Sequence, residues 1–138
     1  RAPVTRGMMA AAITLVMVFY HFVLAPTWAP EGWALVADTA LHYATPLVYL
    51  VWWGVTVRHG ELKWGDIPAM LVPPTLYLIY VLIRGAAIGE YPYPILEANR
   101  IGYGVVALNV LAVLIGLTAF CAIVIALDRR LGRAKGPQ

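Results

Sequence analysis

The hydrophobic residues of this chain are gathered into four long, nearly uninterrupted runs. The runs cover residues 7–25, 33–57, 67–88 and 101–127, and the first and the last contain no charged residue. A bilayer core about 30 Å thick is crossed by about 20 apolar residues of helix, so each run is long enough to span a membrane. The pattern therefore predicts an all-α fold, a polytopic bundle of four transmembrane helices forming one domain over residues 1–138.

Short polar connections separate the runs. Residues 26–32 are rich in proline and glycine, residues 58–66 are charged, and the last connection opens with Pro92 and Pro94 close together. Proline lacks the amide hydrogen that a helix interior needs, so helices end at such positions. After the fourth run, residues 128–138 form a basic polar tail, which is expected to be loose.

The composition excludes other broad classes. Hydrophobic residues make up 62% of the chain and charged residues only 12%, whereas soluble domains carry about 25% charged residues. Neither a water-soluble domain nor a disordered chain fits these values. The one cysteine, Cys121, excludes an internal disulfide framework and a cysteine-based zinc cluster.

The placement of positive charge predicts the orientation in the membrane. Of the ten lysine and arginine residues, all but Arg84 and Arg100 lie before the first run, in the second connection or in the tail. Loops rich in lysine and arginine stay in the cytoplasm, so both termini are predicted to be cytoplasmic. The net charge of +3 is then explained mostly by the orientation of the helices in the membrane. No nucleic-acid partner is expected.

Asp38 and His42 are the strongest candidates for chemistry. Ionisable groups within membrane spans are costly and usually face a bundle interior or water. Four residues apart on one helix, these two side chains share a face, and a carboxylate beside an imidazole prepares it to act as a general base. The alternatives are an Asp38 that caps the helix or reaches the headgroups, and a His42 that bonds a neighbouring helix.

Other polar residues are expected at the same outer level. With cytoplasmic termini, His21, Arg84, Tyr91 and Tyr103 fall near the outer helix ends, and together with the Asp38–His42 pair they form a candidate ligand-binding cluster. The alternative is that helix ends are generally more polar than helix centres. His21, Asp38 and His42 have the donor types of a transition-metal site, but no local metal-binding motif supports one. We therefore predict neither a metal nor a cofactor.

Several short segments together suggest a family. Residues 41–46 read LHYATP, residues 82–85 LIRG, residues 89–94 GEYPYP and residues 102–104 GYG. This order resembles the bacterial membrane-protein family called "Pr-six-Pr", and it is distantly similar to the eukaryotic androgen-induced-protein (FAR/AIG-like) family.

The resemblance implies a bundle of about six spans, of which this chain would be the C-terminal two-thirds, in a bacterial inner membrane. The eukaryotic relatives hydrolyse fatty-acid esters of hydroxy fatty acids with an intramembrane threonine and histidine. His42 matches that histidine, although its spacing to Pro46 is one residue shorter. The threonine belongs to a span that has no counterpart here, so the resemblance implies that a further N-terminal span carries the nucleophile.

Three functions follow as hypotheses. The first is a hydrolase of lipid or fatty-acid esters, with His42 as base and Asp38 as its orienting partner. The second is a small transporter or a lipid-binding protein that uses the same outer cluster as a binding site. The third is a structural subunit of a membrane complex. All three place the chain in a lipid bilayer, and a small bundle of this kind is compatible with a homo-oligomer.

Overall fold

The computed structural model describes residues 2–134, which form helices and short connections without a strand. Four stretches of these residues are long and apolar enough to cross a membrane: Ala2–Thr27, Gly32–Thr56, Trp64–Ile88 and Tyr103–Ala134. The prediction of an all-α chain with four helices long and apolar enough to cross a membrane is confirmed for these residues, and the architecture is compatible with a polytopic membrane protein.

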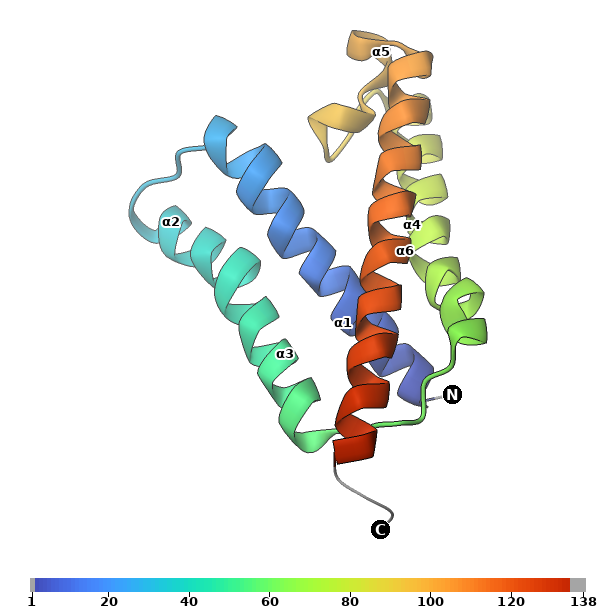
Figure 1. Cartoon of the computed structure of the whole chain (residues 1–138). Helices are drawn as coiled ribbons and strands as arrows, with labels where there is room; N and C mark the ends of the chain where they lie inside the picture. The colour runs from blue at the N-terminus through green and yellow to red at the C-terminus, as the bar shows by residue number, and fades with distance from the viewer. Residues whose placement is uncertain (1, 135–138) are drawn as a thin grey trace.

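Three of the four stretches contain more than one kind of helical turn (Figure 1). The first comprises α1 (Ala2–Phe19), the π turn η1 (Tyr20–Leu24) and the 3-10 turn η2 (Ala25–Thr27). The second comprises α2 (Gly32–Thr39), the π turn η3 (Ala40–Ala44) and α3 (Thr45–Thr56). The third begins with the 3-10 turn η4 (Trp64–Asp66) and continues as α4 (Ile67–Ile88), and the fourth is α6 (Tyr103–Ala134).

The end of α6 differs from the prediction. The helix was expected to stop at residue 127, but it continues to Ala134, so the expectation of a loose tail is wrong for residues 128–134. The reason is that Asp128 is buried against the connection that follows α3. The rest of the predicted tail, residues 135–138, lies outside the described residues. The bounds of α4 coincide with the predicted run at residues 67–88.

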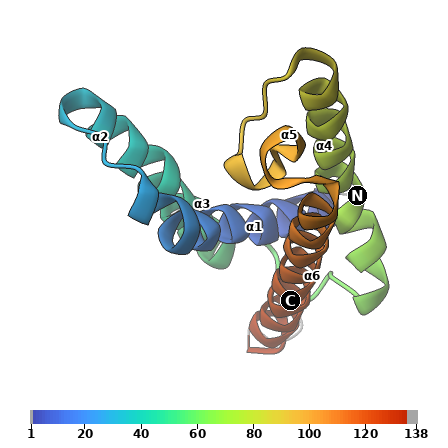
Figure 2. The same ribbon diagram turned by 90° about the horizontal axis from the view of Figure 1, so that it is seen from above.

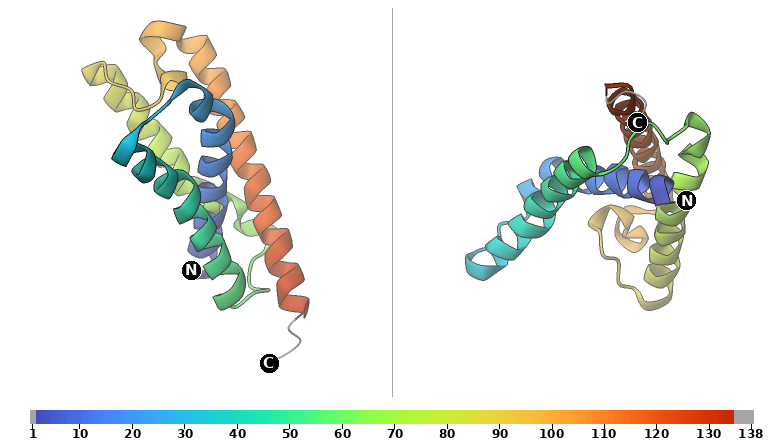
Figure 3. Two further views of the ribbon diagram at one scale, coloured as in Figure 1. Left: turned by 90° about the vertical axis from the view of Figure 1, so that its left-hand side faces the viewer. Right: turned by 90° about the horizontal axis from the view of Figure 1, so that it is seen from below.

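Toward one end of the molecule, α2 and the end of α1 lie apart from α4 and α6 (Figure 1). The start of α1 and the end of α6 lie at the same end, and α6 passes alongside α1 (Figures 1 and 3). Seen from above, α2 points away from α4 and α6, and the connection after α4 lies in the angle between α2 and α4 (Figure 2). We call the end with the chain termini the terminal end and the other the far end.

The main core lies toward the terminal end. Ala10 and Ala11 of α1 are fully buried, and they pack in one cluster with Trp53, Met70 and Cys121. Small residues let membrane helices approach closely, because without a strong hydrophobic force close packing supplies the attraction. A second, smaller cluster lies at the far end, where η5 (Pro94–Leu96) and α5 (Ala98–Ile101) cover α4 and α6.

A buried carboxylate fastens the α3–α4 connection to α6. The backbone amides of Gly60 and Leu62 donate to Asp128 Oδ2 at 3.0 and 2.9 Å, and His59 Nδ1 lies 3.1 Å from Asp128 Oδ1. On its other side, His59 Nε2 lies 3.1 Å from the carbonyl oxygen of Gly54. Both oxygens of the carboxylate are therefore hydrogen-bonded. This explains why an acidic side chain can be buried in the last turns of α6.

Candidate functional site between two wide helical turns

The candidate site lies where two π turns face each other at the far end. In η1, the amide of Ala25 bonds the carbonyl of Tyr20, and in η3 the amide of Thr45 bonds the carbonyl of Ala40. Each wide turn is followed, after one residue, by a proline, Pro26 or Pro46. A proline has no amide hydrogen for the carbonyl four residues earlier, so the carbonyls of Phe22 and His42 receive no helical bond from Pro26 and Pro46, in the same stretches where the helices widen. Such π turns occur often at functional sites, because they change the direction in which side chains project.

Asp38 and His42 lie together, as their helical spacing predicts. His42 Nδ1 is 3.2 Å from Asp38 Oδ1 and 3.0 Å from the carbonyl oxygen of the same residue. Both are acceptors, so Nδ1 carries the hydrogen and donates it. This leaves Nε2 as the unprotonated nitrogen of the neutral ring. Within residues 2–134 no hydrogen bond is formed to Nε2, and the His42 side chain is 27% exposed, so Nε2 is accessible from outside the pair.

Tyr20 completes the pair, and the sequence did not single it out for this role. Its hydroxyl donates a hydrogen bond to Asp38 Oδ2. Its ring also stacks on the His42 ring, with centroids 3.8 Å apart and planes 8° from parallel. Tyr20 therefore contacts both members of the pair and holds them in place. The available signal was the proline after each wide turn, since Pro46 lies four residues after His42 and Pro26 lies six residues after Tyr20.

His21 joins this group at its edge. Its Nδ1 lies 3.0 Å from the hydroxyl of Tyr43, and the Tyr43 ring meets the Tyr20 ring edge-on at 5.6 Å. His21 does not contact Asp38 or His42 directly. Among the residues that the structure describes, no three side chains of the metal-binding types form a group able to hold an ion.

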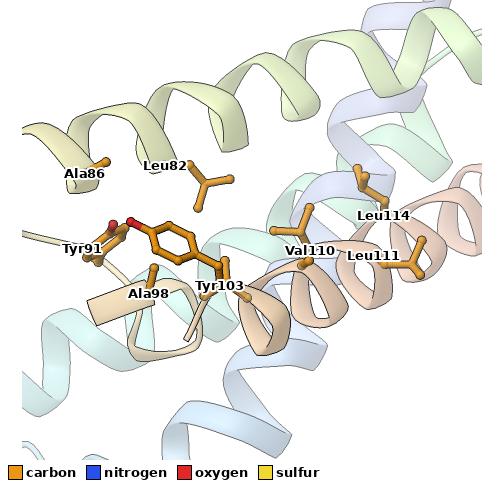
Figure 4. Close-up of a pocket in the computed structure, with 10 residues that line it drawn as sticks. Leu82, Ala86, Tyr91, Ala98, Tyr103, Val110, Leu111 and Leu114 are labelled. Atoms are coloured by element: carbon orange, nitrogen blue, oxygen red, sulfur yellow. The ribbon is translucent and has the colours of Figure 1, made fainter. Parts of the chain in front are cut away.

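The remaining predicted site residues form a separate group between α4 and α6. Tyr91 and Tyr103 line a groove there (Figure 4). Arg84 lies nearby and pairs with Glu90, its guanidinium 3.5 Å from the carboxylate. No recorded contact joins these residues to His42. The six residues proposed as one outer cluster thus lie at the same end of the molecule but in two groups: one on the first two membrane stretches, the other on α4, α6 and the connection between them.

Tyr93 packs the connection that follows α4 against that helix. Burial, followed by hydrogen bonding to Tyr77, raises the pKa of Tyr93 to about 12. Its hydroxyl therefore stays protonated at any physiological pH, and it contributes a neutral polar contact between this connection and α4.

Comparison of the chain with protein families, with curated proteins and with solved structures gives no match. The functional interpretation consequently rests on the geometry of the residues described above.

Proposed function

We propose that this chain is part of a bacterial inner-membrane hydrolase of lipid esters, with His42 as its general base. The observation that carries the proposal is the orientation of His42: Asp38 holds Nδ1 while Nε2 remains open. The arrangement follows the general logic of an imidazole positioned by a carboxylate. The position of His42, shortly before Pro46 in a membrane helix, adds the support of the family resemblance.

In the proposed reaction, Nε2 of His42 removes a proton from a hydroxyl nucleophile as its oxygen attacks the ester carbonyl. The nucleophile is water or a hydroxyl from outside this chain, because no hydroxyl within residues 2–134 is hydrogen-bonded to Nε2 of His42. The imidazolium that forms is stabilised by Asp38, and Tyr20 fixes the other carboxylate oxygen. The same proton then passes to the leaving alkoxide as the ester C–O bond breaks. With water as nucleophile, this step gives acid and alcohol directly; with a hydroxyl, it gives the alcohol and an acyl ester, which a water activated by the same Nε2 then cleaves to the acid and the free hydroxyl.

The test is hydrolysis of a panel of long-chain fatty-acid esters by membranes that carry the full-length native protein. His42→Ala is expected to abolish turnover, since no other group can replace Nε2. His21→Ala is the matched control, because His21 bonds Tyr43 and not Asp38, and it should keep most activity. Equal turnover in wild type and His42→Ala, at matched protein levels, would exclude His42 as the base.

A transport or binding role is the second candidate. It is favoured because no hydroxyl within residues 2–134 is hydrogen-bonded to Nε2 of His42, and a binding site needs none. If no ester is hydrolysed, the same membranes should be reconstituted in proteoliposomes and tested for uptake. Uptake that is lost in Asp38→Asn would assign the pair to substrate or proton binding.

A further inference from the structure

His59 is a buried titratable residue that the proposed reaction does not use. It lies at the terminal end, in the connection that follows α3, and its side chain has no exposed surface. Its Nδ1 lies 3.1 Å from Oδ1 of Asp128 on α6, and its Nε2 lies 3.1 Å from the carbonyl oxygen of Gly54 on α3. One imidazole ring therefore joins the end of α3 to the end of α6.

Both partners of the His59 ring are hydrogen-bond acceptors. The carbonyl of Gly54 has no hydrogen to donate, and Oδ2 of Asp128 already accepts bonds from the amides of Gly60 and Leu62, as an ionised carboxylate does. A ring nitrogen bonds an acceptor only if it carries hydrogen, and both nitrogens carry hydrogen only in the imidazolium form. Because imidazole is more basic than carboxylate, the proton between His59 and Asp128 belongs to the ring. The geometry thus requires a positively charged His59.

The surroundings of His59 suit a positive charge. Gly54 lies in the last turn of α3, where carbonyl groups lack helical partners and the helix dipole is negative. Asp128 supplies the opposite charge on the other side of the ring. The ring of Trp53 packs against His59 with the two centroids 4.8 Å apart. A buried charge is tolerated in such a place because it is paired and hydrogen-bonded.

Among the described residues, Asp128 is the charged side chain that bonds His59. On α3 the groups that face the ring are the Gly54 carbonyl and the Trp53 ring, neither of which titrates. Other charged side chains nearby form no hydrogen bond or ion pair with His59 within residues 2–134: Arg6 of α1, Arg58, Glu61 and Lys63 of the connection, and Arg129 and Arg130 of α6. The titration of this bridge is therefore that of His59 and Asp128.

We propose that His59 is a pH-sensitive latch between α3 and α6. With two ring hydrogens, it bonds both Gly54 and Asp128. With one hydrogen it bonds only one of them, and the other ring nitrogen turns a lone pair toward an oxygen. The latch is therefore closed while the ring is protonated, and it opens as rising pH removes the second proton. Opening lets the connection separate from Asp128, and the proposal does not depend on any role of His42.

The first measurement is the protonation state of His59 in the full-length protein, labelled with ¹⁵N-histidine and held in detergent micelles. The nitrogen chemical shifts distinguish the imidazolium ring from each neutral tautomer. We expect both His59 nitrogens to be protonated under conditions where the amides of Gly60 and Leu62 are protected from hydrogen exchange. A neutral His59 ring under those conditions would overturn the proposal.

The second measurement is hydrogen exchange of the Gly60 and Leu62 amides over a pH series, expressed relative to an unstructured peptide so that base catalysis cancels. Their protection should fall about tenfold as His59 loses its proton, the difference between hydrogen bonds from a charged and a neutral donor. The amides of Leu117 and Cys121, in the core part of α6, should keep their protection. Constant protection while the ring titrates, or a joint loss in all four amides, would contradict a local latch.

His59→Gln tests the residue itself, because glutamine is polar but does not titrate. Protection of Gly60 and Leu62 should be lower in this variant at low pH and should no longer depend on pH. Glu61→Gln is the matched control, since Glu61 is an exposed carboxylate of the same connection, and it should keep the wild-type pH dependence. A pH dependence that survives in His59→Gln, or that disappears in Glu61→Gln, would overturn the assignment. If His59→Gln does not fold, the two measurements on the wild-type protein still decide.

Discussion

At the scale of single residues, a close backbone approach lies where α6 passes the α3–α4 connection. A Cβ on Gly132 would lie 2.6 Å from the Cα and 2.7 Å from the amide nitrogen of Gly60. Gly60 itself has a φ of +91°, a conformation that other residues rarely adopt. Two glycines are thus needed for the connection and the helix to pass each other.

Gly132→Ala should accordingly destabilise the protein by about 1–3 kcal/mol, the usual cost of forcing extra volume into a packed site. The measurement is thermal unfolding in detergent, followed by circular dichroism. Gly54→Ala is the matched control, since no heavy atom lies within 4 Å of a Cβ at Gly54. A Gly132→Ala protein that unfolds at the wild-type temperature would contradict the close approach.

At the scale of elements, a single carboxylate joins the α3–α4 connection to α6. Asp128→Ala leaves the amides of Gly60 and Leu62, and Nδ1 of the buried His59 ring, without their acceptor. Breaking a buried pair of this kind costs about 3–5 kcal/mol. Hydrogen exchange should show the amides of Gly60 and Leu62 losing most of their protection.

Asp66→Ala is the control for that prediction. Asp66 bonds the exposed amide of Lys63 at 2.9 Å, so its loss should cost about 1 kcal/mol, as for other helix-start residues. If Asp66→Ala proved as damaging as Asp128→Ala, then burial of the carboxylate would not be the reason for its importance.

The wide turns η1 and η3 show how far an element can be anticipated from its residues. Proline at positions 26 and 46 indicates a break in helical bonding, and the helical spacing of Asp38 and His42 places them on one face. The sequence gives no sign that the turns before these prolines differ from a regular α-helix. That the helices widen to π turns before these prolines, and that Tyr20 meets Asp38 and His42 there, became evident only in the structure.

At the scale of the whole molecule, the terminal end carries most of the positive charge, and we expect it to face the cytoplasm. The test places single cysteines at Glu31 or Gly65 in a Cys121→Ala background, because Cys121 is buried. A membrane-impermeant maleimide added to intact cells should label Glu31→Cys, and it should label Gly65→Cys only after the cells are opened. The reverse pattern would place the termini outside.

What the sequence determined by itself is the set of membrane-crossing helices and the neighbourhood of Asp38 and His42. Both depend on positions along one helix: the length of an apolar run sets the span, and a spacing of four sets the face. Such properties need no knowledge of how helices pack.

Only the tertiary structure decided which distant residues meet. Tyr20 on Asp38, Asp128 on the amides of Gly60 and Leu62, and the separation of Arg84, Tyr91 and Tyr103 from His42 all depend on which helices lie side by side. Apolar helices of similar composition can pack in several arrangements. The choice among them is made by small residues, glycine contacts and buried hydrogen bonds that act between segments far apart in the chain.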